Sequence, residues 1–122
     1  KARQEIANRY HAGLQMLDAQ RRLSTPKTRS NATHVFHQYT LWTENRDALV
    51  RHLQDHGIGT AVYYPLSLHL QEVFQVSGAV PRELPNAEKA TQCALSLPMF
   101  PELTAEMINH VIGQINLFFN RQ

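Results

Sequence analysis

The chain has 122 residues, of which 43% are hydrophobic and 18% are charged, and its formal net charge is +2. This length fits one domain that buries roughly two thirds of the surface of its unfolded chain, and the composition excludes the disordered and fibrous classes. The basic residues are scattered and form no stripe with interleaved aromatic residues, which argues against a nucleic-acid partner.

The N-terminal segment predicts an amphipathic helix. Its apolar residues recur every three or four positions and form one stripe: Ala2, Ile6, Tyr10, Leu14 and Leu17. No Ser, Thr, Asp or Asn precedes Lys1 as an N-cap. Two explanations stay open, a chain cut from a longer one and a frayed terminus.

A strand is predicted at 34–42, after a polar loop at 24–32. Alternation gives it apolar residues on both faces, with Val35, Tyr39 and Leu41 on one and Phe36 and Trp42 on the other. Such a strand is covered on both sides or faces a partner. His34 and His37 fall on opposite faces, so we expect no shared metal ion between them.

The segment 45–56 predicts a second helix, with Asn45 as its N-cap and Gly57 as the left-handed residue that ends it. Its buried stripe consists of Leu49, Val50 and Leu53. His52 and His56 are four residues apart on one face, a spacing that can bind zinc. No third ligand and no HExxH motif accompany them, so we expect a solvated helix face.

A short strand is predicted at 58–64, where β-branched and aromatic residues gather before Pro65. Tyr63, Tyr64 and His69 stand together where the chain leaves this strand. Strand ends and loops often carry binding residues because a rigid scaffold positions them. Two interpretations stay open: a ligand-facing edge, or two tyrosines on opposite faces of a sheet beside a surface histidine.

The last third alternates short elements with loops. It predicts one or two helical turns at 68–76, a loop at 77–84, a helix at 86–94 after Pro85, a strand at 94–97 and an irregular segment at 98–101. Thr104 is the expected N-cap of the final helix, and Leu103 and Ile108 have the spacing of a hydrophobic staple. The apolar stripe of that helix comprises Ile108, Val111, Ile112, Ile115 and Phe118 or Phe119. Helices alternating with strands in this order predict a small α+β domain.

The sequence contains no complete catalytic constellation. It has no GxSxG elbow, no glycine-rich phosphate loop and no cysteines at metal-ligand spacing. The three lysines, Lys1, Lys27 and Lys89, stand in polar contexts, unlike the desolvated amines of imine chemistry. We therefore predict no catalytic, cofactor-binding or metal-binding residue on this chain.

The only cysteine and the hydropathy pattern indicate a compartment. Cys93 cannot form an internal disulfide, which favours a reducing environment, and we expect it to be a small core residue. We see neither a signal-peptide pattern nor an apolar run near the ~20 residues of a membrane-spanning helix. The expectation is a cytoplasmic domain without a membrane partner.

Five motifs follow one another along nearly the whole chain: RQEIANRYHAGL, HVFHQYTLW, NRDALVRHLQDHGI, YYP with LHLQ, and SLPMFPELT, with LPNAEKA before the last. In this order they resemble the C-terminal small domain of the DegT/DnrJ/EryC1/StrS family of sugar aminotransferases. Two positions depart from the family pattern. Ser67 stands where a second proline is more usual, and Tyr63 stands where many members have His. The departures bear on which sugar is handled.

The resemblance implies a fold-type I, pyridoxal-phosphate enzyme that aminates nucleotide-linked keto sugars for polysaccharide, lipopolysaccharide or antibiotic sugar biosynthesis. It implies an α+β fold with a small three-stranded, mainly antiparallel sheet and helices packed against it. The cofactor and its lysine would belong to a large N-terminal domain that is not in this sequence. We therefore expect residues 1–122 to be a single small domain that is inactive by itself.

The resemblance also implies roles and partners. Tyr63, Tyr64 and His69 match positions near the substrate and are expected to contact its sugar or phosphate, whereas Phe100 is expected to pack against the large domain. The expected partners are the nucleotide sugar, an amino donor such as glutamate, the large domain and a second copy in a homodimer.

Two functions from other classes stay open. One is a stand-alone ligand-binding or regulatory α+β module, which tight binding of a small molecule by this chain alone would favour. The other is an interaction domain that uses the two-sided strand with Phe36 and Trp42, which a large apolar dimer interface would favour.

Overall fold

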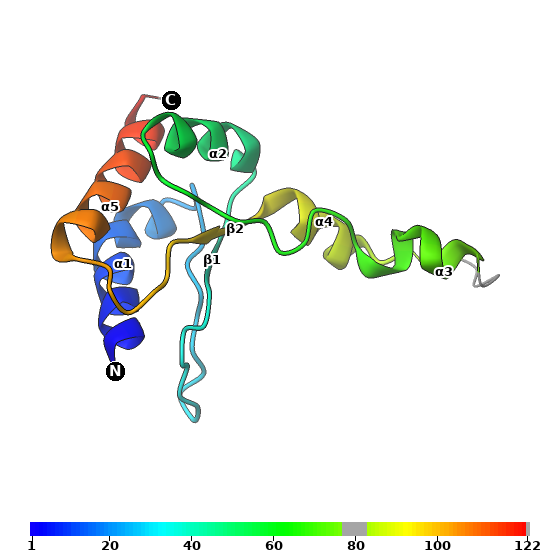
Figure 1. Ribbon diagram of the computed structural model, residues 1–122, viewed down its shortest axis with the longest axis horizontal. Coiled ribbons are helices and arrows are strands. Elements are labelled where there is room, and N and C mark those ends of the chain that lie inside the picture. Colours follow the sequence, from blue (N-terminus) through cyan, green and yellow to red (C-terminus); the bar gives the residue numbers. More distant parts are fainter. Residues whose placement is uncertain (77–82, 122) are drawn as a thin grey trace.

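The helices gather around a short sheet, and one part of the chain extends away from them. The computed structural model describes residues 1–76 and 83–121. The elements are α1 (Ala2–Ala19), β1 (Tyr39–Trp42), α2 (Arg46–Asp55), the 3-10 turn η1 (Leu68–Leu70), α3 (Glu72–Val76), α4 (Pro85–Cys93), β2 (Ala94–Leu97) and α5 (Ala105–Asn120). Figure 1 shows α1, α2 and α5 beside the strands, while η1, α3 and α4 lie on an extension. We call residues 63–76 and 83–93 the arm. Most of the loop predicted at 77–84 lies outside the described residues.

The apolar stripes of α1 and α5 form the core, as their spacing predicts. Buried residues of α1 are Ile6, Ala7, Tyr10, Leu14 and Leu17, and those of α5 are Ile108, Val111, Ile115 and Phe119. The two helices approach closely at Gly13, where an added Cβ would lie 2.6 Å from Ile112 Cγ2. The Asn116 side-chain amide donates to the Gly13 carbonyl at 3.1 Å, so a hydrogen bond joins the helices at the same level.

The backbone conformation that ends α2 explains why glycine occupies position 57. Gly57 has a φ of +73°, in the left-handed region that glycine adopts without steric cost. The Gly57 N–H donates to Gln54 O, and the Ile58 N–H donates to Leu53 O at 2.9 Å. These two bonds make a Schellman motif. Leu53 and Ile58 are both buried, so the motif also returns the chain to the core.

The start of α5 is capped as predicted. The Thr104 hydroxyl oxygen accepts a hydrogen bond from the Met107 N–H at 3.3 Å. Leu103, before the cap, packs against the core that contains Ile108. The cap and the apolar residues beside it fix where the helix begins.

The sheet has two strands where the sequence predicts three. β1 and β2 pair antiparallel, with Tyr39 opposite Leu97 and Trp42 opposite Ala94. The predicted strand at 58–64 is wrong as a strand: it makes one isolated bridge, in which Ala61 exchanges both backbone hydrogen bonds with Ser96. The next pair toward the N-terminus would join Gly59 to Pro98, which has no N–H to donate. Beyond Ala61 in the other direction the chain turns into the arm.

The prediction of a strand at 34–42 is correct only for its second half. Phe36 has a φ of +47°, which interrupts the alternation on which the face assignment depended. As a result Phe36 is buried in the core beside Tyr39, with ring centroids 6.2 Å apart, and Val35 is 73% exposed. Phe36 is therefore not part of an outward apolar face with Trp42, and the two-sided interaction strand is wrong.

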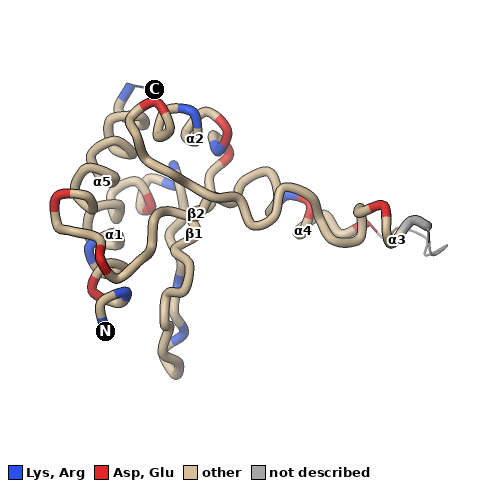
Figure 2. Tube along the Cα trace, in the orientation of Figure 1, with Lys and Arg blue, Asp and Glu red and all other residues tan. Residues whose placement is uncertain are grey.

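Charge is spread over the molecule. Figure 2 shows basic and acidic positions mixed on the helices, and long uncharged stretches on the arm. The described helices include none with the length and apolar character to cross a membrane. Cys93 is buried at the end of α4, in agreement with the prediction of a small core residue.

Candidate functional site

A cleft of about 290 Å³ lies where the 59–63 segment passes the edge of β2. Its lining joins Thr60, Ala61 and Tyr63 with Ser96 of β2 and with His37 of the segment before β1. Hydroxyl and imidazole groups therefore face the same space as backbone of the bridge. Such a mixture of polar side chains on a fixed scaffold is typical of a site that binds a polar ligand.

Hydrogen bonds connect the lining of the cleft to the core and the sheet. Pro98 belongs to the lining, and its carbonyl oxygen accepts a hydrogen bond of 3.0 Å from the Tyr10 hydroxyl of α1. Burial raises the pKa of Tyr10 to about 12, so its hydroxyl stays a neutral donor at physiological pH. On the other side, Ser96 and Thr40 share a hydrogen bond of 2.8 Å between their hydroxyl groups. The cleft is thus anchored to both α1 and the sheet.

The two tyrosines differ in their relation to the cleft. Tyr63 lines it and is 50% exposed, while Tyr64 is 72% exposed and is not part of the lining. Their rings contact edge to face, with centroids 5.9 Å apart. Both hydroxyl groups can therefore reach a ligand or a neighbouring surface, and the structure brings these two predicted residues together.

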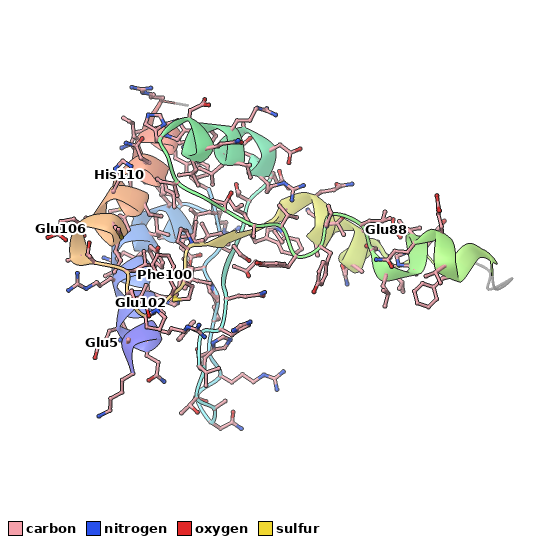
Figure 3. The ribbon with its side chains drawn as sticks, viewed as in Figure 1. Glu5, Glu88, Phe100, Glu102, Glu106 and His110 are labelled. Carbon is pink, nitrogen blue, oxygen red and sulfur yellow. The ribbon has the colours of Figure 1, made fainter. Side chains whose placement is uncertain are left out.

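The third predicted residue, His69, lies further along the arm and does not line the cleft. It belongs to η1, and its Nε2 lies 3.1 Å from Oε1 of Glu88 on α4. The His69 side chain is 15% exposed, so it is largely covered by the arm. Figure 3 labels Glu88 on the arm, away from the body that carries the cleft.

Glu88 is the residue of this region that the sequence interpretation missed. Its Oε1 also accepts the backbone N–H of Leu84, the N-cap residue of α4, at 3.0 Å. The hydrogen bond from Leu84, followed by that from His69, lowers the pKa of Glu88, so this carboxyl group stays ionised at neutral pH. The available signal was the acidic residue in the first turn after Pro85, a position typical of helix capping.

His37 is the second residue that was missed. It is close to Arg3 of α1, whose Nη1 lies 3.4 Å from His37 Nδ1. The sequence interpretation placed it in a regular strand, whereas β1 begins only at Tyr39. The irregular backbone before β1 brings His37 to the cleft.

Three further histidines each contact a backbone carbonyl. His52 Nε2 lies 3.1 Å from the Gln114 carbonyl, and His56 Nδ1 lies 2.7 Å from the His52 carbonyl. His110 Nε2 lies 3.1 Å from the His56 carbonyl. Over residues 1–76 and 83–121, no three metal-ligating side chains are grouped to hold a metal ion.

The lysines are all at the surface. Lys1, Lys27 and Lys89 are exposed, and the Lys89 amine lies 3.4 Å from the Glu44 carboxylate. An amine that forms a stable imine with pyridoxal phosphate normally lies in a desolvated pocket or beside another cation. The described residues therefore do not fit a covalent site for this cofactor.

The chain resembles known proteins over nearly its whole length. The model of the DegT/DnrJ/EryC1/StrS aminotransferase family matches residues 1–116. A pleiotropic regulatory protein of Geobacillus stearothermophilus is 52% identical over 95 residues, which are 78% of this chain and 26% of that protein. The dTDP-3-amino-3,4,6-trideoxy-alpha-D-glucose transaminase of Streptomyces venezuelae is 34% identical over 98% of this chain and 31% of its own length.

A solved structure shows a similar fold over nearly the whole chain. The crystal structure of NtdA from Bacillus subtilis with bound cofactor PMP superposes with a TM-score of 0.86 at 27% identity, over 98% of this chain and 28% of that one. The chain thus spans between about a quarter and a third of the length of these proteins. Its α+β arrangement is the one found in that part of them.

Proposed function

Since the chain belongs to the DegT/DnrJ/EryC1/StrS aminotransferase family, we propose that it is the C-terminal small domain of a pyridoxal-phosphate-dependent enzyme that aminates a nucleotide-linked keto sugar. The observation that carries this proposal is the match of residues 1–116 to the family, together with 34% identity over 98% of the chain to a dTDP-sugar transaminase. The product would serve polysaccharide, lipopolysaccharide or antibiotic sugar biosynthesis.

The cofactor belongs, in this proposal, to the part of the full-length protein outside this chain. Pyridoxal phosphate supplies the carrier for the amino group and the electron sink of transamination. Support comes from the exposure of all three lysines and from the PMP named for the NtdA structure. Residues 1–122 would accordingly be inactive by themselves and would act by shaping one wall of the active site.

Binding and orienting the sugar nucleotide is the role we assign to this chain. Tyr63 and Tyr64 can donate or accept hydrogen bonds at sugar hydroxyl groups, because both side chains are at least half exposed and Tyr63 lines the cleft. His69 can contact a phosphate or hydroxyl group from its fixed place on the arm. Holding the substrate in one orientation lowers the entropic cost of the reaction.

Exposed apolar residues on the arm and beside β2 would contact the rest of the full-length enzyme. Leu68, Val73 and Phe74 of the arm are 40% or more exposed, and Phe100 in the connection to α5 is 43% exposed. Exposed large apolar side chains gathered on one part of a chain are typical of a protein interface. We assign it to the large domain and to a second copy in a homodimer, in a cytoplasmic enzyme with glutamate as its amino donor.

Assay of the full-length protein tests the proposal. The purified enzyme, loaded with pyridoxal phosphate, would be incubated with glutamate and a panel of UDP- and dTDP-linked keto sugars, and amino sugars would be identified by mass spectrometry. We expect amination of at least one member of the panel. Failure on every substrate, with the Streptomyces venezuelae transaminase active on its own substrate in the same panel, would overturn the proposal.

A further inference from the structure

The pair of His69 and Glu88 joins two parts of the arm that are 19 residues apart in the sequence. One partner comes from the turn η1 and the other from the first turns of α4. Both side chains are partly shielded, with 15% of His69 and 38% of Glu88 exposed. A contact between two half-covered side chains is screened less by solvent than one at the open surface.

The carboxylate of Glu88 is also held by the start of α4, through a contact that does not involve His69. Its Oε1 accepts the Leu84 N–H at 3.0 Å, while the Glu88 N–H donates to the Leu84 carbonyl at 2.9 Å. The first bond ties the Glu88 side chain to the N-cap residue of α4, and the second is an ordinary helical i→i−4 bond. Because the acceptor is held by the helix, the imidazole that bonds to it is held as well.

The pairing also decides the state of the ring. An ionised carboxylate can only accept hydrogen bonds, so His69 Nε2 must carry the proton that is shared with Glu88. Nε2 is therefore the ring nitrogen that is held on Glu88.

We propose that Glu88 is a positioning residue, which orients the His69 imidazole for a hydrogen bond to the sugar nucleotide. The inference rests on the proposed function, since it needs that substrate. Glu88 itself does not touch the substrate. Its effect is transmitted through the imidazole, whose Nε2 stays on the carboxylate.

Kinetics of the full-length enzyme test this pairing. Glu88→Gln retains an oxygen acceptor for both Leu84 and His69 and removes only the charge, so we expect an unchanged Tm. Hydrogen bonds to charged groups contribute more than neutral ones, so KM for the nucleotide sugar should rise roughly three- to ten-fold in Glu88→Gln and roughly ten- to a hundred-fold in His69→Ala. The kcat of Glu88→Gln should stay within about two-fold of the wild type, because orientation in the bound state is what is lost.

The double variant separates this role from a structural one. If Glu88 acts through His69, the KM of Glu88→Gln/His69→Ala equals that of His69→Ala alone, whereas independent effects would multiply. The matched control is Glu44→Gln, which removes the exposed pair with Lys89, the neighbour of Glu88 on α4, and should leave KM unchanged.

Two results would overturn the inference, and they differ in what they say about the function. A raised KM in His69→Ala with a normal KM in Glu88→Gln, or multiplying effects in the double variant, would remove Glu88 from the site and leave the proposed function intact. A normal KM in His69→Ala would remove the proposed substrate contact, and the role of Glu88 with it.

Discussion

Gly13 of α1 and Ile112 of α5 are in such close contact that no Cβ fits between them. An ideal Cβ on Gly13 would lie 2.6 Å from Ile112 Cγ2 and 2.7 Å from its Cδ1. The absence of a side chain at Gly13 therefore sets the distance between the two longest helices, and the Asn116 hydrogen bond to the Gly13 carbonyl maintains it. Glycine inside a helix is destabilising because it loses more conformational entropy on folding than other residues. Here the close packing of α1 against α5 offsets that cost.

The first prediction concerns this contact. Gly13→Ala should destabilise the protein by up to about 2 kcal/mol, because overpacking costs about 1–3 kcal/mol and the higher helix propensity of alanine returns about 1 kcal/mol. Chemical denaturation measures the change. Gly113→Ala is the matched control: its added Cβ would meet nothing within 4 Å, so the same substitution in α5 should be neutral or stabilising. Stabilisation by Gly13→Ala would contradict the packing argument.

A second prediction concerns Ile112 itself. The residue is partly buried against the core, so Ile112→Ala should cost about 2 kcal/mol, at the low end of large-to-small substitutions. Combined with Gly13→Ala the loss should be smaller than the sum, because the added methyl group occupies space that Ile112 leaves. Strict additivity in denaturation experiments would show that the two residues do not compete for the same space.

The third prediction concerns the cap of α5. Thr104→Ala should cost about 1 kcal/mol, because the Met107 N–H loses its acceptor at the start of the helix. Thr104→Ser keeps the hydroxyl oxygen and should restore most of the stability. Equal losses in both variants would assign the effect to the methyl group of threonine instead of the hydrogen bond.

The fourth prediction separates substrate binding from chemistry. In the full-length enzyme, His69→Ala and Tyr64→Phe should raise KM for the nucleotide sugar with little change in kcat, because both groups orient the substrate. The amino-donor half-reaction, measured alone, should be nearly unaffected. Loss of that half-reaction in His69→Ala would mean that His69 takes part in the chemistry and that its assignment to sugar binding is wrong.

The fifth prediction concerns the cofactor. We expect the 122-residue chain, mixed with pyridoxal phosphate and borohydride, to show no single stoichiometric adduct, because its three lysines are exposed and hydrated. Peptide mapping by mass spectrometry would detect such an adduct. A clean adduct at one lysine, accompanied by turnover of an amino donor, would contradict the proposal that the cofactor site lies outside this chain.

The helices could be predicted from the sequence because their determinants are local. Thr104, Gly57 and the stripe of α5 each act within a few residues, through a cap, a left-handed backbone or a repeating apolar spacing. The strands were predicted less well because pairing depends on distant residues. Whether 58–64 becomes a strand depends on Pro98, which cannot extend the ladder next to Ser96.

The positions of the candidate residues could be predicted in part for the same reason. Tyr63 and Tyr64 are neighbours in the sequence, so their contact is local, and Tyr63 reaches the cleft where the 59–63 segment passes β2. His69 was expected at the same edge, but the arm carries it to Glu88, a partner that only the folded chain reveals. The positive φ of Phe36, which brings His37 to the cleft, has no sequence signal because phenylalanine seldom adopts it.

The single bridge between Ala61 and Ser96 has a consequence for how the chain behaves among other copies of itself. The groups of β2 that face away from β1 all have partners: the Ala94 N–H donates to Ala90, the Ala94 carbonyl accepts from Arg46, and both Ser96 groups bond to Ala61. Sheet edges with free donors and acceptors recruit strands from other molecules, which leads to aggregation. Because this edge is already saturated, and Pro98 beyond it offers no donor, β2 cannot serve as a template for intermolecular sheet growth.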